Sequence, residues 1–583
     1  MGGAFRSPRL RVTARPGGAW SARRLPSSVD AGHRLAVAAG HPSLVAPDAV
    51  HVYSNRIARD MLPGVIKPLV WTVNTSIVNA AWIQILEEVL GPLHIRPEDL
   101  TRTFGHRAYF DMTTFGVVFE ALGMPRDSLE LMMGLPKDSE RPRMRATPAM
   151  LRHVRRMAAA GRQTLSRGRW VRAELRSMQA AYAPLAAVDP AQLDEVALLR
   201  HAEHVAMLAR RAAYANIVVP MTQLAYERSL WRLTRLASVD PAAIDPAAGR
   251  RDRAAWDPNA ALDLVRDLAA ALDGGPETAE LLQAFNAFVA RFGHLSGSTN
   301  DFTRAPWRED RDAIVDLVLA HPTRARLAAR VEPAVVEARL APALRPTFRL
   351  LWRRTGAFHV YRQAVGTTWS RGYGLLRGTF LALGARFVAR GLIDRTDDVF
   401  YLTLTEVRAL VGATPVSEPP GAAAAGLGEL PDPPRALVAR RRREVLEAAD
   451  LEVPETVRGD AFVPRRRAAT PRASLRGTGA SPGIVRARAR VIRGTEDFPR
   501  VQPGDVIVIP FSDVGWMPLF ARAAGVVAEE TGGLLSHTAV VSREYGIPCV
   551  VGVEGACGAI PDGATVVVDG AMGSVKVEEP DAR

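Results

Sequence analysis

Apolar residues recur three and four positions apart along most of the chain between about residues 75 and 410. The pattern is clearest in the segments 150–183, 193–236 and 261–292, where Arg, Asp and Glu fill the positions between the apolar ones. This spacing gathers the apolar side chains on one face of a helix. Strand-like patterns are scarce in this part of the chain. We therefore predict a large, mainly α-helical domain over residues 49–410, interrupted at Pro190, Pro241, Pro246 and Pro306.

The pattern changes after about residue 472, where short apolar runs are divided by Gly and Pro. Segments 477–492, 505–510 and 565–569 alternate or run apolar as β-strands do, and 525–528 has the composition of a buried strand. Residues 538–545 have helical spacing, closed by Gly546 and Pro548. We predict a small α/β domain over residues 472–580. The expected fold class is thus multidomain, with a large, mainly α-helical domain followed by a small α/β domain.

Two further segments show no regular spacing of apolar residues. Residues 1–48 contain seven arginines and two aspartates. This composition predicts a disordered leader. The alternatives are a transit peptide or a misassigned start codon. Residues 411–471 predict a low-complexity linker and a basic helix that begins at Arg440, whose charges we expect on a solvated face. A hinge is expected at about residues 455–472, where Pro464 and Pro471 lie.

The amino-acid composition limits the classes of protein to which this chain can belong. Hydrophobic residues make up 48% and charged residues 23%, as in soluble globular proteins. The net charge is +14, but only three of the 75 basic residues are lysines and no nucleic-acid motif is present, so we expect no nucleic-acid partner. The apolar segment 69–86 contains Asn74, Asn79 and Gln84, which predicts a buried helix rather than a membrane span. Cys549 and Cys557 lack the spacing of a metal site, and we expect reduced thiols in a cytoplasmic protein.

The strongest candidate chemistry lies at His537, where a Gly-rich turn enters the predicted helix. Gly532 and Gly533 allow the backbone to approach a bound group closely. The amides at the start of a helix favour a bound phosphate. A neutral imidazole has a lone pair that can attack a phosphoryl group. The Thr531 and Ser536 hydroxyls and the Arg543 guanidinium are candidates to hold that phosphate. The alternative is a structural histidine beside a turn.

Two loops of the helical part are candidate substrate sites. The first, residues 51–71, concentrates Asn55, Arg56, Arg59 and Lys67 around a Pro-Gly turn, although the turn and charges are also typical of a capped helix with a solvated face.

The second loop, residues 291–310, is rich in Gly and Ser and contains His294 and Asp301, which suit deprotonation of a hydroxyl group. Its alternative is a capped helix junction in which Trp307 anchors the packing.

The string 531–548, Thr-Gly-Gly-Leu-Leu-Ser-His followed by Arg543 and Gly-Ile-Pro, closely resembles the phosphohistidine motif of the phosphoenolpyruvate-utilising enzymes. This family includes phosphoenolpyruvate synthase, pyruvate phosphate dikinase, rifampin phosphotransferase and enzyme I of the sugar phosphotransferase system. The resemblance implies that His537 is phosphorylated in turnover on a small swivelling domain that shuttles between two active sites. Similarity extends over roughly residues 51–580, but Leu295 stands where relatives usually carry Arg, and Asn300 stands near a position that is often acidic.

The family's ATP-grasp domain does not fit into the segment before His51, and we find no Walker-type loop. The resemblance therefore implies a phosphotransferase component that receives phosphate from an ATP- or phosphoenolpyruvate-dependent donor site, with ATP and Mg²⁺ on an ATP-grasp partner subunit. This chain would bind neither strongly, and would pass the phosphate to a small acceptor in the helical domain. One alternative is a non-catalytic regulatory or scaffold protein that binds a partner kinase or a small molecule. Another is a longer enzyme whose start was misassigned.

Overall fold

The computed structural model describes most of the chain after residue 50. The described residues are 20–21, 36–37, 51–91, 93–94, 96–121, 148–240, 244–247, 250, 252, 255–271, 279–309, 331–412, 432–449, 451–459, 461–462, 465–466, 473–530 and 536–578.

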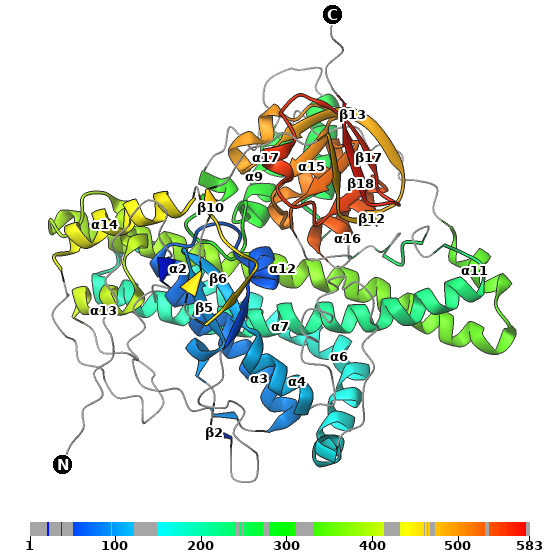
Figure 1. Cartoon of the computed structure of the whole chain (residues 1–583), viewed down its shortest axis with the longest axis horizontal. Coiled ribbons are helices and arrows are strands. Elements are labelled where there is room, and N and C mark those ends of the chain that lie inside the picture. The colour runs from blue at the N-terminus through cyan, green and yellow to red at the C-terminus, as the bar shows by residue number, and fades with distance from the viewer. Residues whose placement is uncertain are drawn as a thin grey trace, which may run out of the picture.

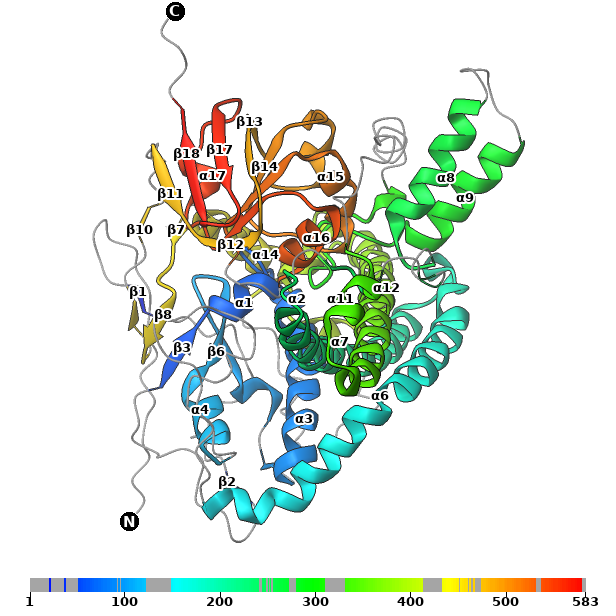
Figure 2. The ribbon, with the colours of Figure 1, turned by 90° about the vertical axis from the view of Figure 1, so that its right-hand side faces the viewer.

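Three long helices form the body of the helical part: α6 (Pro148–Ala186), α7 (Glu195–Leu236) and α12 (Arg345–Ala389). Helices α7 and α12 lie side by side along much of their length (Figures 1 and 2). Their facing positions three and four residues apart are buried, as the sequence pattern predicted. The prediction that residues 75–410 are mainly helical is confirmed.

Shorter helices surround this body. They are α1 (Arg56–Met61), α2 (Pro68–Asn74), η1 (Thr75–Asn79), α3 (Ala80–Leu90), α4 (Met112–Ala121), α8 (Pro258–Ala271), α9 (Ala279–Phe292), α11 (Pro333–Arg339), α13 (Leu404–Val411) and α14 (Pro434–Ala449). The single helical stretch expected at 261–292 is two helices, α8 and α9. Among the described residues, Pro68–Glu88 is the one segment apolar and long enough to span a membrane, and 67% of its most apolar window is buried inside the structure, as predicted for a core helix.

A four-stranded antiparallel sheet interrupts the helical part, contrary to the expectation of few strands. Its order is β5 (Thr101–Phe104), β6 (Arg107–Asp111), β3 (Val52–Ser54) and β8 (Thr456–Arg458). Gly105 and His106, both with positive φ, form the tight turn between β5 and β6. Strand β8 comes from the predicted linker and is paired with β3. The apolar segment near residue 400 has the composition of a short strand, but it forms the 3₁₀ helix η7 (Thr396–Tyr401).

The α/β region, orange to red in Figures 1 and 2, is built on an eight-stranded sheet. Strands β13, β14, β15 and β16 pair in parallel, and the remaining strands continue the sheet antiparallel. The bounds are β11 (Ser474–Arg476), β12 (Thr478–Ser481), β13 (Ile484–Val491), β14 (Val506–Ile509), β15 (Gly525–Ala528), β16 (Cys549–Val551), β17 (Thr565–Asp569) and β18 (Ser574–Val577).

Both faces of the central strands are buried, which explains their continuous apolar runs. Ile507 and Ile509 of β14 pack with helices α15 (Met517–Arg522) and α16 (His537–Tyr545). Val506 and Val508 of the same strand pack on the opposite face with α17 (Ala556–Ala559). The predicted α/β architecture of this region is confirmed.

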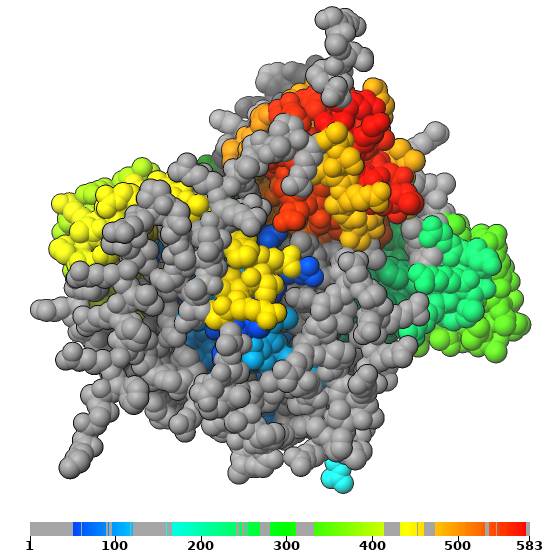
Figure 3. Space-filling model, in the orientation of Figure 1, coloured from blue at the N-terminus to red at the C-terminus, as the bar shows by residue number. Residues whose placement is uncertain are grey.

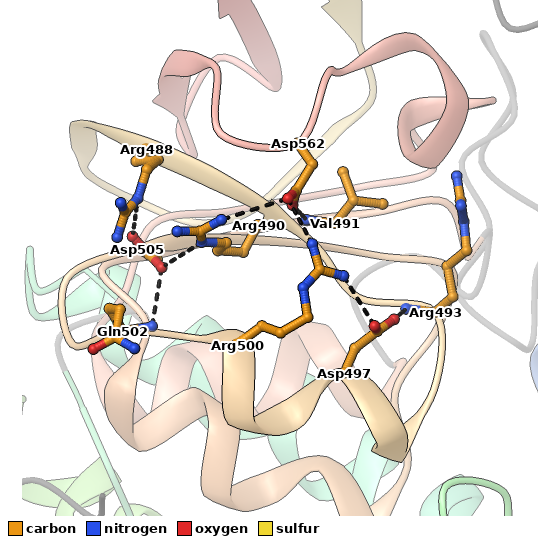
Figure 4. Close-up of polar contacts among 9 residues, drawn as sticks. All are labelled: Arg488, Arg490, Val491, Arg493, Asp497, Arg500, Gln502, Asp505 and Asp562. Carbon is orange, nitrogen blue, oxygen red and sulfur yellow. Dashed lines mark hydrogen bonds and ion pairs between the residues drawn. The ribbon is translucent and has the colours of Figure 1, made fainter.

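Arginine-carboxylate pairs tie β13 to neighbouring loops of the α/β region (Figure 4). Arg488 and Arg490 both contact the buried Asp505, at 3.1 and 3.2 Å. Arg500 contacts Asp562 at 2.6 Å, and Arg490 reaches the same carboxylate at 3.4 Å. Part of the arginine excess is therefore used in internal ion pairs.

The α/β region contacts the helical part through the loop between β14 and α15. Val514 and Met517 share an apolar cluster with Leu295 and Trp307. Trp516 Nε1 donates to the Gly297 carbonyl at 2.8 Å. In the space-filling view, the orange and red atoms of the α/β region stand above the helical part (Figure 3).

Candidate functional site

His537 is the first residue of α16, and β15 is the strand that precedes this helix in the sequence. Ser536 is the N-cap, and its Oγ accepts a hydrogen bond from the amide of Ala539 at 3.1 Å. Gly546, in the left-handed conformation with φ 66°, ends the helix. The predicted strand before His537 and the predicted helix after it are confirmed. Thr531, Gly532 and Gly533, the predicted phosphate-binding turn, lie outside the described residues.

Hydroxyl groups and one carboxyl group surround the start of α16. The Oγ atoms of Ser512 and Thr538 are 2.6 Å apart, and the Ser512 amide donates to Glu530 Oε2 at 3.2 Å. Glu530 is buried, and burial raises the pKa of its carboxyl, against hydrogen bonds from Thr538 and Ser536 that lower it. The raised pKa increases the share of the neutral form, so this carboxyl repels a nearby phosphate less than a solvated glutamate would.

Arg543 lies near the far end of α16, where its Nη1 donates to the carbonyl of Ala480 in β12 at 3.1 Å. Its charge also acts on Glu227 of α7, so the guanidinium lies between the α/β region and the helical part. Whether it contacts a phosphate on His537 stays a prediction.

A buried carboxylate of the helical part faces α16. Glu227 accepts from Gln223 Nε2 at 2.8 Å and lies 2.6 Å from His359 Nε2 of α12. Burial alone would raise the pKa of Glu227, but the hydrogen bond and charge of His359, with smaller contributions from Gln223 and Arg543, lower it to about 2. The helical surface under α16 therefore holds a fixed negative charge beside a histidine.

Asp513 makes a second polar contact between the two regions. Its Oδ2 accepts from the amide of Thr299 at 2.7 Å, and its Oδ1 accepts from the amide of Val514. Burial raises the pKa of Asp513 to about 6, although these hydrogen bonds and the charge of Arg362 on α12 lower it. Because Ser512 touches Thr538, this contact lies next to the start of α16.

Sequence reasoning missed Asp513, Glu530, Glu227 and His359. Asp513 and Glu530 follow the parallel strands β14 and β15, and the loops after parallel strands meet at one edge of a sheet, which was an available signal. Nothing in the local pattern of α7 or α12 marks the other two residues.

The predicted acceptor-binding residues form three separate groups. In the first, Arg56 pairs with Glu455 at 2.8 Å, and Arg59 donates to the buried Asn55 at 3.2 Å. The Asn55 amide also donates to the Glu455 carbonyl. These contacts link α1 to the segment before β8.

Lys67 belongs to a second group at the start of α2. Its Nζ lies 5.6 Å from the ring centre of Phe400 and 5.2 Å from that of Tyr401. Burial lowers the pKa of Lys67, and Asp301 acts in the opposite direction. Asp301 itself accepts from the amide and hydroxyl of Thr303 at 3.0 and 2.7 Å.

His294 lines a cavity and forms the third group. Its Nε2 lies 2.9 Å from the carbonyl of Thr367, and burial lowers its pKa to about 4. Leu295 and Asn300, the two nearby positions that depart from the family pattern, have structural roles. Leu295 is fully buried, and Asn300 accepts from Trp369 Nε1 and donates to the Met61 carbonyl, each at 2.8 Å.

Within the described part of the chain, no three His, Cys, Asp or Glu side chains are grouped as a metal site would need. Cys549 and Cys557 are buried free thiols, and burial raises the pKa of Cys549 to about 12.

Residues 501–573, which include β14, β15 and His537, match the family model described as "PEP-utilising enzyme, mobile domain". This part of the chain is therefore similar to the mobile domain of the PEP-utilising enzymes.

The chain is also similar to several curated proteins. An uncharacterised protein of Mycobacterium tuberculosis is 34% identical over 52% of this chain and 32% of its own length. The rifampicin phosphotransferase of Bacillus cereus is 29% identical over 50% of this chain and 34% of its own length. The prodigiosin synthesizing transferase PigC of Serratia marcescens is 28% identical over 54% of this chain and 36% of its own length. The matches thus span about a third of the length of these relatives.

Proposed function

We propose that this chain is the phosphoryl-carrying component of a phosphotransferase, with His537 as the residue that carries the phosphate. The donor would be ATP with Mg²⁺ on an ATP-grasp partner, or phosphoenolpyruvate, which becomes pyruvate after transfer. The acceptor would be a small molecule bound in the helical part, and the reaction would take place in the cytoplasm.

The chemistry needs two displacements at phosphorus. An imidazole nitrogen of His537 attacks the donor phosphoryl group, a P–N bond forms, and the P–O bond to the leaving group breaks. An acceptor oxygen then attacks the same phosphorus, the P–N bond breaks, and its electron pair returns to the imidazole. The proton of the acceptor hydroxyl passes to a base or to water. Positioning and charge neutralisation supply most of the catalysis in such transfers.

The orientation of α16 is the observation that carries the proposal. His537 begins a helix at the side of the α/β region nearest α12 (Figures 1 and 2). The amides of its first turn supply the partial positive charge that suits a phosphate. The contacts of Asp513 with Thr299 and of Trp516 with Gly297 hold this side against the helical part. This arrangement supports delivery of phosphate to a ligand of the helical part.

The test is mass spectrometry of the intact chain under alkaline conditions, which preserve phosphohistidine. The chain is incubated with ATP and Mg²⁺, with and without an ATP-grasp partner protein, and separately with phosphoenolpyruvate. We expect one acid-labile phosphate on His537, and with ATP only when the partner is present.

His537→Gln should abolish the signal, whereas His204→Gln, which changes an exposed histidine of α7, should leave it unchanged. Absence of phosphate with every donor would overturn the proposal and favour a regulatory or scaffold role. Phosphate on another residue in the His537→Gln variant would overturn the assignment of the carrier.

A further inference from the structure

A cavity of about 300 Å³ opens between α6, α9 and α12, and most of its lining residues carry polar groups. Its size is at the lower end of the range for small-molecule sites. Among the residues that the structure describes, no acidic side chain lines it, whereas two arginines, Arg291 and Arg371, do. The remaining polar lining is Gln179, Tyr182, His294, Thr367 and Thr368.

The two arginines have no carboxylate partner among the described residues. Within the part of the chain that the structure describes, Arg371 makes no ion pair or hydrogen bond, and the contacts of Arg291 are with the rings of Trp256 and Phe292. In the same chain, many other arginines are paired with Asp or Glu, as Arg377 is with Glu309 at 2.9 Å. Two unpaired guanidinium groups beside one cavity create a positive field that an anion can neutralise.

A second, independent observation is the hydroxyl of Tyr182. The side chain is fully buried, and its hydroxyl has no hydrogen-bond partner among the described residues. Such a group costs stability unless a ligand or water satisfies it. Gly372 of α12 makes room for it, because a Cβ at that position would lie only 2.6 Å from the Tyr182 oxygen.

His294 adds an uncharged wall to the same cavity. Burial, with smaller contributions from Arg371 and Arg308, lowers the pKa of its imidazole to about 4. The ring is therefore neutral near pH 7, and its Nε2 hydrogen is directed to the Thr367 carbonyl. In this tautomer Nδ1 keeps its lone pair.

From this geometry we infer that the cavity binds a small ligand through an anionic group, a phosphate or a carboxylate, held by Arg371, Arg291 and the Tyr182 hydroxyl. The exposed Arg291 covers the Trp256 ring at 5.9 Å, so an aromatic or other flat body fits at the rim beside that ring. The binding site stands on its own geometry, and its assignment as the acceptor site rests on the proposed function.

The position of the cavity connects it to α16. The loop that follows α9 contributes His294 to the cavity wall and Thr299 to the contact with Asp513. On α12, Arg371 lies nine residues after Arg362, about 14 Å along the helix axis. A ligand in the cavity therefore lies on the same stretch of loop and helix that the α/β region contacts.

The experiment measures binding by isothermal titration calorimetry to the full chain without a phosphoryl donor. The probes are inorganic phosphate, phenyl phosphate, benzoate and, as the uncharged probe, benzyl alcohol. We expect the anions to bind and benzyl alcohol not to bind. Tighter binding of phenyl phosphate than of benzoate would assign a phosphate ligand, and the reverse order would assign a carboxylate.

Three variants test the assigned groups. Arg371→Gln should weaken binding about tenfold or more, and Arg291→Gln should weaken it less, because Arg291 is exposed. Arg353→Gln is the matched control: it changes an exposed arginine of the same helix that lies away from the cavity, and should leave binding within about twofold.

Tyr182→Phe keeps the packing and removes the unsatisfied hydroxyl, so anion binding should weaken while thermal stability stays equal or rises.

The inference is overturned if no anion binds the wild-type chain, or if Arg371→Gln and Tyr182→Phe bind the anions as the wild-type chain does. The His537→Gln variant separates this result from the proposed function, because the cavity does not contain His537 and the variant should bind the anions normally. Normal anion binding with no phosphate on His537 supports the cavity site and overturns the phosphoryl-carrier proposal. Phosphate on His537 without anion binding supports the phosphoryl-carrier proposal and overturns the cavity site.

Discussion

The Asp513 carboxylate accepts a hydrogen bond from the backbone amide of Thr299 at 2.7 Å and so joins the α/β region to the helical part. The two residues come from loops far apart in the sequence, one after β14 and the other after α9. Ser512, the residue before Asp513, also touches Thr538 of α16, so this hydrogen bond lies beside the start of that helix.

The contact between the two regions should depend on pH. The pKa of Asp513 is raised to about 6 in the docked structure, above its ordinary value of 3.8, so the docked state binds the proton more tightly than a separated state does. Docking should therefore strengthen as the pH falls from 7 through 6 toward 4, and weaken as it rises through 6. Hydrogen-exchange protection factors of the Thr299 amide measure this, because they correct for the intrinsic effect of pH on exchange.

Asp513→Asn keeps an acceptor for Thr299 and removes the titrating group. It should keep the protection and lose its pH dependence between 5 and 7. If the variant retained the pH dependence of the wild-type chain, the titration would belong to another group.

Gly515→Ala should displace the α/β region from the loop after α9. A Cβ at residue 515 would lie 2.1 Å from the Ser296 carbonyl oxygen, which is too close for any packed pair of atoms. Either the loop shifts or the regions separate, and Thr299 then loses protection against hydrogen exchange. Gly558→Ala is the control, because no atom of the described residues outside its own helix lies within 4 Å of the added Cβ. Unchanged protection in Gly515→Ala would mean that the backbone adjusts locally without undocking.

The elements with strong local signals could be predicted from the sequence. Alternating or continuous apolar runs predicted β14, β15 and β17, and the string around His537 predicted the start of α16 and its end at Gly546. These elements are determined by neighbours in the sequence, so their pattern is visible without the fold.

The residues that were missed depend on segments that meet only in three dimensions. Glu227 and His359 come from α7 and α12, and the cavity of Arg371 needs α6 and α9 as well. The basic run at 440–443 was predicted as a solvated face, but Arg441 is buried because a carboxylate from α13 lies opposite it. A charge pattern alone does not indicate which arginine meets such a partner.

Ser536→Ala should affect both stability and the phosphohistidine. Loss of the N-cap hydrogen bond to Ala539 should lower stability by about 1 kcal/mol. The hydroxyl is also a predicted phosphate contact, so the phosphohistidine at His537 should hydrolyse faster in the variant. Urea unfolding and a time course of phosphate loss at alkaline pH measure the two effects.

Thr403→Ala is the matched control for that variant. Thr403 caps α13 through its hydrogen bond with the Glu406 amide at 3.2 Å, within the helical part. Its loss should cost a similar free energy of unfolding and leave the phosphohistidine lifetime unchanged. Equal lifetimes in both variants would limit Ser536 to a structural role.

The pair of Arg441 with Glu406 should give the largest loss of stability among these changes. Both residues are buried, and the guanidinium makes two contacts with the carboxylate, at 2.6 and 2.8 Å, and one with the Tyr401 carbonyl. Arg441→Met leaves the carboxylate buried without its cation and should cost about 3–5 kcal/mol in the free energy of unfolding. The neighbouring Arg440→Met removes only half-exposed ion pairs, with Asp432 and Glu444, and should cost about 1 kcal/mol or less.

The double variant Glu406→Gln with Arg441→Met distinguishes a lost attraction from a stranded charge. If the cost of Arg441→Met comes from the uncompensated carboxylate, removing that charge as well should recover a large part of the lost stability. The remaining deficit then reflects the hydrogen bonds of Glu406 with Thr403 and of Arg441 with Tyr401. Additive losses in the double variant would mean instead that the two side chains stabilise the junction of α13 and α14 independently.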